Sequence, residues 1–267
     1  MRCLRVLLDA GVQVPLAVTH RDDPAERIWF ASVAELARSR GIELLEDPGT
    51  EKLTLLLKAI EPDFIFSFYY RRMLPEFVLK MARRGAFNMH GSLLPKYRGR
   101  APVNWAVLNG ETETGATLHE MVAKPDAGRI IDQQRVPIGP DDLAVEVFRK
   151  VTDAAEVVLK RSLKGILSGT AKLQPQDLSG GSYFGGRRPE DGRIDWSKGA
   201  REIHNLVRAV APPYPGAFTD GLRINKTRLE DRAAPAGRLG PYREGEEWFA
   251  ACGDGKVLRL LEIEHEK

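Results

Sequence analysis

The sequence predicts an α/β protein in which a parallel sheet domain is followed by a smaller β-rich domain. Short apolar runs alternate with helix-like segments through the first two thirds of the chain, which is typical of a parallel sheet covered by helices on both faces. A region rich in Gly, Pro, Ser and charged residues then precedes a tail of short strand-like pieces. We therefore expect a first domain over residues 1–170, a linker over 171–198 and a β-rich domain over 199–267.

Hydrophobic periodicity places the individual elements. Apolar residues recur at helical spacing in several segments, and the first two of these end at glycine. The predicted helices cover residues 3–11, 26–41, 51–61, 75–82, 101–109 and 142–167. Short apolar runs bounded by turn residues predict strands at 14–20, 42–46, 63–70, 85–90, 114–122 and 129–138. The tail holds one helix, over 201–210, and strands broken by Pro and Gly, which is consistent with a small β-barrel or open sheet.

Composition and charge exclude several classes of protein. The 267 residues are 43% hydrophobic and 29% charged, which is ordinary for a globular protein with a sizeable core. The net charge of +3 gives no electrostatic case for a nucleic-acid partner. Cys3 and Cys252 lack the spacing of a metal site or a disulfide framework, so we expect two reduced thiols. Because no apolar stretch is long enough to span a bilayer and no secretion signal is present, the sequence predicts a cytoplasmic protein.

The stretch FNMHGSLLPKYRGRAPVNWA, residues 87–106, is the strongest functional signal. Alternation puts the side chains of Asn88 and His90 on the same face of an extended segment, so both can act on one reacting atom. In parallel sheets, ligands bind beyond the carboxyl ends of the strands. Residues 70–74 and 88–97, which lie at the ends of two predicted strands, are therefore expected at the functional edge of the sheet.

This stretch, together with GETETGATLHEMVAKPDAGRII and RAVAPPYPGAF, resembles the 10-formyltetrahydrofolate-dependent formyltransferase family. The resemblance covers nearly the whole chain. It implies a Rossmann-like catalytic domain, a small OB-like β-barrel domain, and transfer of a formyl group from 10-formyltetrahydrofolate to an amine without a metal. Within the family, FIFSFYYRRMLP before GAFNMHGSLLPKYRGRAP is most similar to the formyltransferase domain of enzymes that act on UDP-4-amino-4-deoxy-L-arabinose in lipid A modification.

The resemblance implies that Asn88, His90 and Asp126 are catalytic. Formyl transfer passes through a tetrahedral oxyanion, which needs positioned hydrogen-bond donors, and the attacking amine must lose a proton. An Asn amide is a donor that does not depend on pH, an imidazole can stabilise the oxygen or move a proton, and a carboxylate can orient the imidazole. Each residue also has a structural interpretation, as a turn cap, a buried histidine or an Asx turn. The three family contexts together favour catalysis, and His119 is expected to have a structural or supporting role.

The same resemblance predicts the residues that bind ligands. The folate is expected to contact Arg72, Met73, Leu74, Arg100, Val122, Ala123, Lys124, Pro125 and Asp126. Core packing competes with this interpretation at Met73 and Leu74, and a solvated basic turn suits Lys96 and Arg98 equally well. The acceptor is expected to contact Tyr97, Arg208 and Tyr214. Packing is the alternative for Tyr97, and fixing the loop between prolines is the alternative for Tyr214.

A nucleotide-linked amino sugar is the acceptor that we favour over initiator methionyl-tRNA. A pyrophosphate needs Arg, Lys or backbone donors, which the chain can supply. A tRNA favours a basic loop or a strongly basic domain that grips phosphates, and neither stands out in the sequence. Hydrolysis of formyltetrahydrofolate is a third hypothesis because it uses a similar Asn, His and Asp set, although the PPYPGAF tail argues against it.

The resemblance also implies that one strand is missing. Members of the family begin with a strand inside the parallel sheet, whereas this sequence opens directly at a predicted helix. Either the natural start lies upstream of Met1, or another segment fills the place of the strand. Unpaired backbone groups left by a missing interior strand cost about 1–3 kcal/mol each. A relative that binds folate or nucleotide without catalysis is therefore a further hypothesis, which the presence of Asn88, His90 and Asp126 argues against. We expect small-molecule partners and no membrane partner, and leave self-association open.

Overall fold

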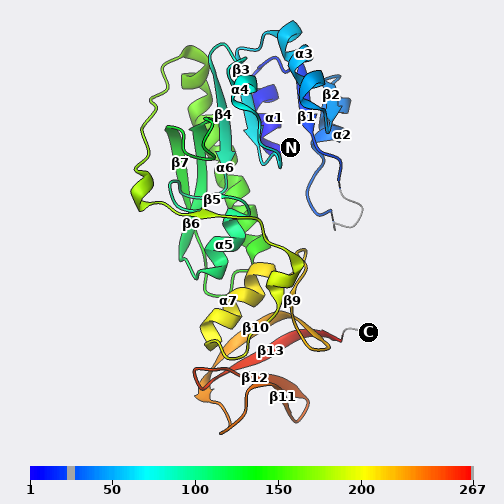
Figure 1. Cartoon of the computed structure of the whole chain (residues 1–267), viewed down its shortest axis with the longest axis vertical. Helices are drawn as coiled ribbons and strands as arrows, with labels where there is room; N and C mark the ends of the chain where they lie inside the picture. The colour runs from blue at the N-terminus through cyan, green and yellow to red at the C-terminus, as the bar shows by residue number, and fades with distance from the viewer. Residues whose placement is uncertain (23–27, 266–267) are drawn as a thin grey trace. The chain divides into compact units, whose positions relative to one another are not determined.

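The computed structural model describes residues 1–22 and 28–265, which form two compact units (Figure 1). Each unit combines separate stretches of the chain. The first unit contains Met1–Arg98, Gly115–Arg135 and Val151–Tyr183, and the second contains Gly99–Thr114, Val136–Lys150 and Phe184–Lys267. The second unit therefore includes two segments from the region in which the sequence predicts one continuous domain.

Two of the described β-sheets lie wholly or mainly in the first unit. One is the parallel pair of β1 (Leu16–Thr19) and β2 (Glu43–Glu46). The other has the order β3-β4-β6-β7, formed by β3 (Phe64–Phe68), β4 (Gly85–His90), β6 (Glu113–Glu120) and β7 (Ile130–Pro137). The predicted parallel pairing is confirmed for β1 with β2 and for β3 with β4. β6 adds an antiparallel neighbour to β4, a direction that an apolar pattern does not encode.

No strand within residues 1–22 and 28–265 pairs with both β1 and β3. The chain opens instead with α1 (Arg2–Asp9), as the sequence predicts. One apolar cluster, formed by two leucines of α3 (Thr50–Ile60) and by Val78, nevertheless joins the two sheets, because Leu16, Val18 and Ile65 all pack against it. Side-chain packing therefore connects β1 to β3 in place of backbone pairing.

Sequence periodicity locates the helices better than it locates their ends. The other described α-helices that precede α7 (Ala200–Val210) in the chain are α2 (Val33–Ser39), α4 (Glu76–Leu79), α5 (Pro102–Leu108) and α6 (Ala144–Ser168). α2 begins at Val33 and not at residue 26, because the Ser32 hydroxyl caps it by accepting the backbone N–H of Glu35 at 3.2 Å. Residues 28–32 are not helical, and residues 26 and 27 of the predicted helix lie outside the described residues.

An antiparallel sheet dominates the second unit, and α7 (Ala200–Val210) packs against it. The sheet has the order β11-β12-β13-β10-β9. Its strands are β9 (Ala217–Thr219), β10 (Leu222–Ala233), β11 (Gly240–Glu244), β12 (Glu247–Ala251) and β13 (Lys256–His265). Register shifts between β10 and β13 mark β-bulges, which bend and curl a sheet. The small β-rich domain predicted from the tail is therefore confirmed.

The predicted linker, residues 171–198, contains three short elements. These are η1 (Leu178–Gly180), β8 (Tyr183–Phe184) and η2 (Pro189–Gly192). β8 pairs with the short strand β5 (Arg98–Gly99). Both cysteines are buried free thiols. Among the described residues, no helix has the length and apolar character needed to cross a bilayer.

Candidate active site

Asn88 and His90 lie at the end of β4, and their side chains enter one partly buried cluster. The pairing of β4 with β6 sets Asn88 opposite His119 and His90 opposite Thr117. Directly opposed residues on neighbouring strands bring their side chains together, and the Nδ2 atom of Asn88 is 3.2 Å from the Nε2 atom of His119. Asn88 and His90 therefore share a face of the sheet, as the alternation in the sequence predicts.

A loop between β6 and β7 carries Asp126 to this cluster. The Oδ1 atom of Asp126 is 3.6 Å from Nδ1 of His90 and 3.4 Å from Nε2 of His119. Gln176 fixes the loop, because its side-chain amide donates to the backbone carbonyls of Asp126 and Gly128. The structure thus brings the three predicted catalytic residues together. Gln176 itself comes from the segment that the sequence predicts as a linker.

The hydrogen bonds of His90 determine which of its ring nitrogens is available for chemistry. Its Nε2 atom is 2.8 Å from the backbone carbonyl oxygen of Tyr97, which can only accept, so Nε2 carries the proton of the neutral ring. Nδ1 then keeps a lone pair that faces Asp126. Burial lowers the pKa of His90 from its usual value, and the Asp126 carboxylate opposes this effect only in part. His90 is therefore a neutral base near pH 7, with Nδ1 as its proton acceptor.

His119 is the cluster member that the sequence left with only a supporting role. It is 1% exposed, and its Nδ1 atom is 2.8 Å from the backbone carbonyl oxygen of Glu120. A histidine in an apolar strand gives no catalytic signal by itself. The informative signal is the pairing of His119 with Asn88 across two strands, and a single sequence does not contain that register.

The cluster contains a carboxamide, two imidazoles and one carboxylate. Its N–H groups can donate to a developing oxyanion, and its unprotonated imidazole nitrogen or carboxylate can accept a proton from a nucleophile. Within residues 1–22 and 28–265, no group of three or more His, Cys, Asp or Glu side chains is arranged to hold a metal ion. Burial raises the pKa of the Cys3 thiol to about 11 and that of Cys252 to about 12, so neither is a thiolate nucleophile at neutral pH. The donors and acceptors of the cluster are suited to proton transfer and oxyanion stabilisation.

The residues predicted to bind the folate differ in their environments. The Arg72 guanidinium is paired with Asp47 at 2.6 Å. Met73 is 64% exposed, so the core-packing interpretation is wrong for this residue. Leu74 packs against the apolar cluster that contains Leu53, so the core-packing interpretation is correct for this residue. In the β6–β7 loop, the residues from Val122 to Lys124 are exposed, whereas Pro125 and Asp126 are half-buried.

The basic turn after β4 is only partly solvated. Lys96 and Arg100 are exposed. Arg98 is 8% exposed, so a fully solvated turn is wrong for this residue. Tyr97 is also buried, and its backbone carbonyl accepts the Nε2–H of His90. Tyr97 thus packs in the interior and orients a predicted catalytic side chain.

Arg208 and Tyr214, predicted to contact the acceptor, both lie in the second unit. Arg208 is buried in α7, where Nε donates to Asn205 Oδ1 at 3.0 Å and Nη1 donates to the carbonyls of Gly139 and Asp142. These bonds anchor α7 to the segment before α6. Burial raises the pKa of the Tyr214 hydroxyl to about 12.

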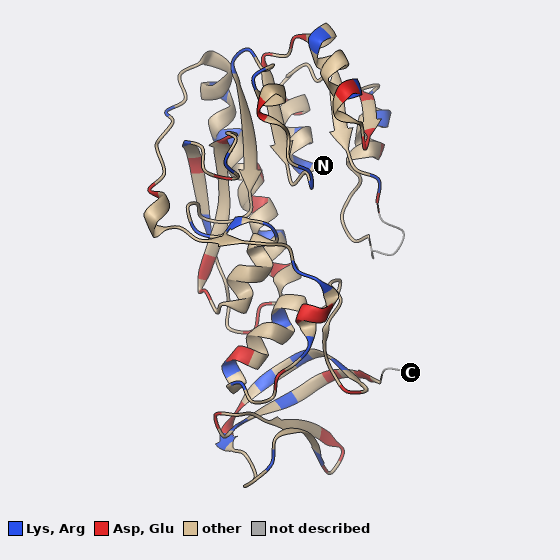
Figure 2. Cartoon of the chain, in the orientation of Figure 1, with Lys and Arg blue, Asp and Glu red and all other residues tan. Residues whose placement is uncertain are grey.

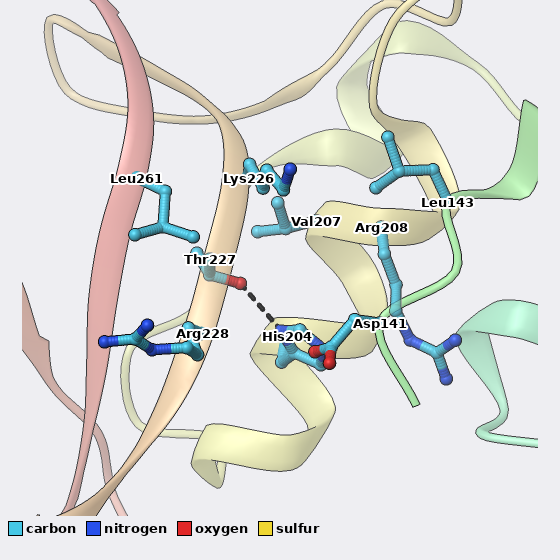
Figure 3. Close-up of a pocket in the computed structure, with 9 residues that line it drawn as sticks. All are labelled: Asp141, Leu143, His204, Val207, Arg208, Lys226, Thr227, Arg228 and Leu261. Atoms are coloured by element: carbon cyan, nitrogen blue, oxygen red, sulfur yellow. Dashed lines mark hydrogen bonds and ion pairs between the residues drawn. The ribbon is translucent and has the colours of Figure 1, made fainter. Parts of the chain in front are cut away.

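A cavity of about 180 Å³ also lies in the second unit, between α7, β10 and β13 (Figure 3). At its wall, Nδ1 of His204 is 2.9 Å from Oγ1 of Thr227, and Asp141 lies beside the same ring. The side chains of Arg208 and Arg228 extend away from one another in Figure 3. The lining therefore does not gather positive charge at one point, and it includes no member of the cluster on β4 and β6.

The chain is similar to known proteins over most of its length. Residues 12–163 match the formyl transferase family, and residues 187–267 match the formyl transferase C-terminal domain. Among solved structures, an N-formyltransferase from Helicobacter canadensis in complex with folinic acid and dTDP-3-aminofucose is 25% identical, with a TM-score of 0.78 over 97% of this chain and 93% of that chain.

Two further structures share the fold. WlaRD, a sugar 3N-formyl transferase in the presence of dTDP and 5-N-formyl-THF, is 24% identical, with a TM-score of 0.77 over 97% of this chain and 92% of that chain. A 4-N formyltransferase from Francisella tularensis is 22% identical, with a TM-score of 0.59 over 87% of this chain and 84% of that chain.

Proposed function

The chain belongs to the formyl transferase family, and we propose that it transfers a formyl group from 10-formyltetrahydrofolate to the amine of a nucleotide-linked amino sugar. One observation carries this proposal, namely that Asn88, His90 and Asp126 meet in one partly buried cluster beside His119. The relative from Helicobacter canadensis, solved with folinic acid and dTDP-3-aminofucose, supports both classes of ligand.

In the proposed reaction, the neutral acceptor amine attacks the formyl carbon. A bond forms between the amine nitrogen and this carbon, and Asn88 donates a hydrogen bond to the oxyanion that develops. His90 takes the amine proton at Nδ1, and Asp126, 3.6 Å away, stabilises the resulting cation. The bond from carbon to folate N10 then breaks, and His90 returns the proton to N10. Before protonation, His90 has no N–H to offer the oxyanion, because Nε2–H is held by Tyr97.

Two segments are proposed to line the folate site. They are residues 72–74, which follow β3, and residues 122–126, which end at the catalytic carboxylate. The apolar side chains of Met73 and Val122 are 64% and 38% exposed, so they are open to an aromatic ring. Arg100 is exposed and is proposed to contact one of the two ligands.

The proposed acceptor is UDP-4-amino-4-deoxy-L-arabinose, which the sequence resemblance singles out. The two relatives studied with dTDP or a dTDP-linked sugar define the main alternative nucleotide. The charges of β10 and β13 argue against a tRNA acceptor, because basic and acidic residues are interspersed there (Figure 2). Lys226 lies 3.9 Å from Glu262 and Arg228 lies 3.0 Å from Glu230, so acidic partners oppose the phosphate attraction of these two side chains.

The decisive experiment follows release of tetrahydrofolate from 10-formyltetrahydrofolate by the purified protein. UDP-4-amino-4-deoxy-L-arabinose, dTDP-linked amino sugars, charged initiator tRNA and water alone serve as acceptors. We expect release only with an amino sugar nucleotide, and a fall in kcat of about 10²-fold or more for His90→Ala and Asp126→Asn. His265→Ala, an exposed histidine at the end of β13, is the matched control and should keep wild-type turnover.

Each other outcome has a definite meaning. Release with tRNA would replace the proposed acceptor, and release with water alone would identify a hydrolase. No release with any acceptor would reject catalysis and leave a ligand-binding protein. Wild-type turnover by His90→Ala would reject the assigned site even if the reaction were correct.

A further inference from the structure

Asn88 can present its amide in two orientations, and we propose that neutral His119 selects the one that serves the reaction. This inference rests on the proposed function, in which Asn88 donates to the oxyanion. The terminal torsion of an Asn side chain is roughly two-fold, so a half turn exchanges the donor Nδ2 with the acceptor Oδ1 with little change in shape. Only a hydrogen-bonding partner distinguishes the two orientations.

The backbone fixes the position of the proton on His119. Its Nδ1 atom lies 2.8 Å from the carbonyl oxygen of Glu120, a group that can only accept, so Nδ1 carries a proton. In the neutral ring, Nε2 is then an acceptor, and Nδ2 of Asn88 lies 3.2 Å from it. The flipped amide would place its oxygen against the lone pair of Nε2, which is repulsive. His119 therefore holds Nδ2 of Asn88 toward itself.

Packing makes this selection effective. His119 is 1% exposed and stands directly opposite Asn88 in the β4–β6 pairing, so solvent cannot easily take its place. An amide nitrogen has two N–H groups. With one directed at His119, the second is left for the reacting oxygen. His119 thus acts through Asn88 as a positioning residue and need not touch the substrate.

Two other groups face the His119 ring. His90 approaches it edge-on from β4, with the ring centres 6.4 Å apart, and Asp126 approaches from the β6–β7 loop, with Oδ1 3.4 Å from Nε2. Asp126 is the competing partner. A proton on Nε2 would bond to this carboxylate and would leave the Asn88 amide without its acceptor. The position of one proton therefore distinguishes the proposed arrangement from its alternative.

Two substitutions separate the nitrogens of His119. His119→Asn keeps a donor near Nδ1 for the Glu120 carbonyl but removes the acceptor near Nε2, whereas His119→Gln can place an amide oxygen near Nε2. We expect kcat to fall about 10- to 100-fold in His119→Asn, with the KM for 10-formyltetrahydrofolate within about 3-fold of wild type. His119→Gln should retain several-fold more activity. Equal losses in the two variants would overturn the proposal.

A double-mutant cycle tests whether His119 acts through Asn88. In an Asn88→Ala background, adding His119→Asn should change kcat by less than about 2-fold, because the group that His119 positions is already absent. A second loss as large as in the single variant would mean that His119 acts independently and would overturn the proposal.

The tautomer can be read without turnover and without any variant. ¹⁵N NMR of the imidazole nitrogens in the wild-type protein at neutral pH should show His119 protonated at Nδ1 and unprotonated at Nε2. A protonated Nε2 would overturn the proposal even if every variant failed to fold. Because this readout needs no acceptor, it also separates failure of this inference from failure of the proposed function.

Discussion

Gly128 is a position where one added methyl group should disturb the proposed catalytic cluster without altering any of its side chains. A Cβ atom on Gly128 would lie 2.8 Å from the carbonyl carbon of Glu120, and nearer still to its oxygen. Ordinary contact begins at 3.4 Å, so the two backbone segments must separate by at least 0.6 Å. The same oxygen accepts the hydrogen bond from His119, and Asp126 lies two residues before Gly128. Gly128→Ala should therefore move His119 and Asp126 relative to Asn88.

The expected cost of this substitution has two parts. Overpacking should lower the free energy of unfolding by about 1–3 kcal/mol, measured by urea titration. Displacement of the cluster should lower kcat by about 10- to 100-fold in the formyl-transfer assay. Gly180→Ala is the matched control, because no atom lies within 4 Å of its Cβ position. An unchanged urea midpoint together with wild-type kcat for Gly128→Ala would refute the reasoning.

Burial also sets the pH response of the site and the role of Arg208. Burial holds the pKa of His90 below 6.5, so kcat/KM calculated per neutral acceptor amine, the form that attacks, should stay level from neutral pH down to about 6.5 and decline only below it. The unfolded chain takes up that proton at a higher pH than the folded chain does, so the free energy of unfolding should also fall as the pH drops below 6.5 and level off below the pKa of folded His90. A decline of this kcat/KM that begins above pH 6.5 would contradict both expectations. Arg208→Met keeps much of the apolar stem but deprives the carbonyls of Gly139 and Asp142 of a donor. It should lower the free energy of unfolding by about 1–3 kcal/mol in urea titration, whereas unchanged stability with a raised acceptor KM would favour a direct ligand contact.

Periodicity in the sequence is sufficient to place most elements, because burial of one face imposes a spacing that is visible in the residues themselves. α1, β4 and α7 lie close to their predicted positions for this reason. The start of α2 is misplaced because apolar residues continue upstream of Ser32, and the capping bond that begins the helix leaves no periodic trace.

Some features of the candidate site could likewise be predicted from the sequence, and others required the structure. The motif around Asn88 and His90 predicts a formyltransferase, and its alternation predicts that the two side chains share a face. The packing that joins β1 to β3 is visible only in the structure. The exposure of individual side chains also required the structure. Met73 is exposed and Arg98 is buried, and neither state could be inferred from the residue type.

The sequence by itself determined the fold class and the direction in which Asn88 and His90 point, because alternate residues of a strand always face the same way. Only the tertiary structure decided that His119 stands opposite Asn88 and that a loop held by Gln176 returns Asp126 to the same cluster. Register and loop closure depend on contacts between residues distant in the chain, and the pattern of any one strand does not encode them. The protonation sites of His90 and His119 follow from those contacts, since each ring is fixed by a backbone carbonyl that only the fold brings within reach.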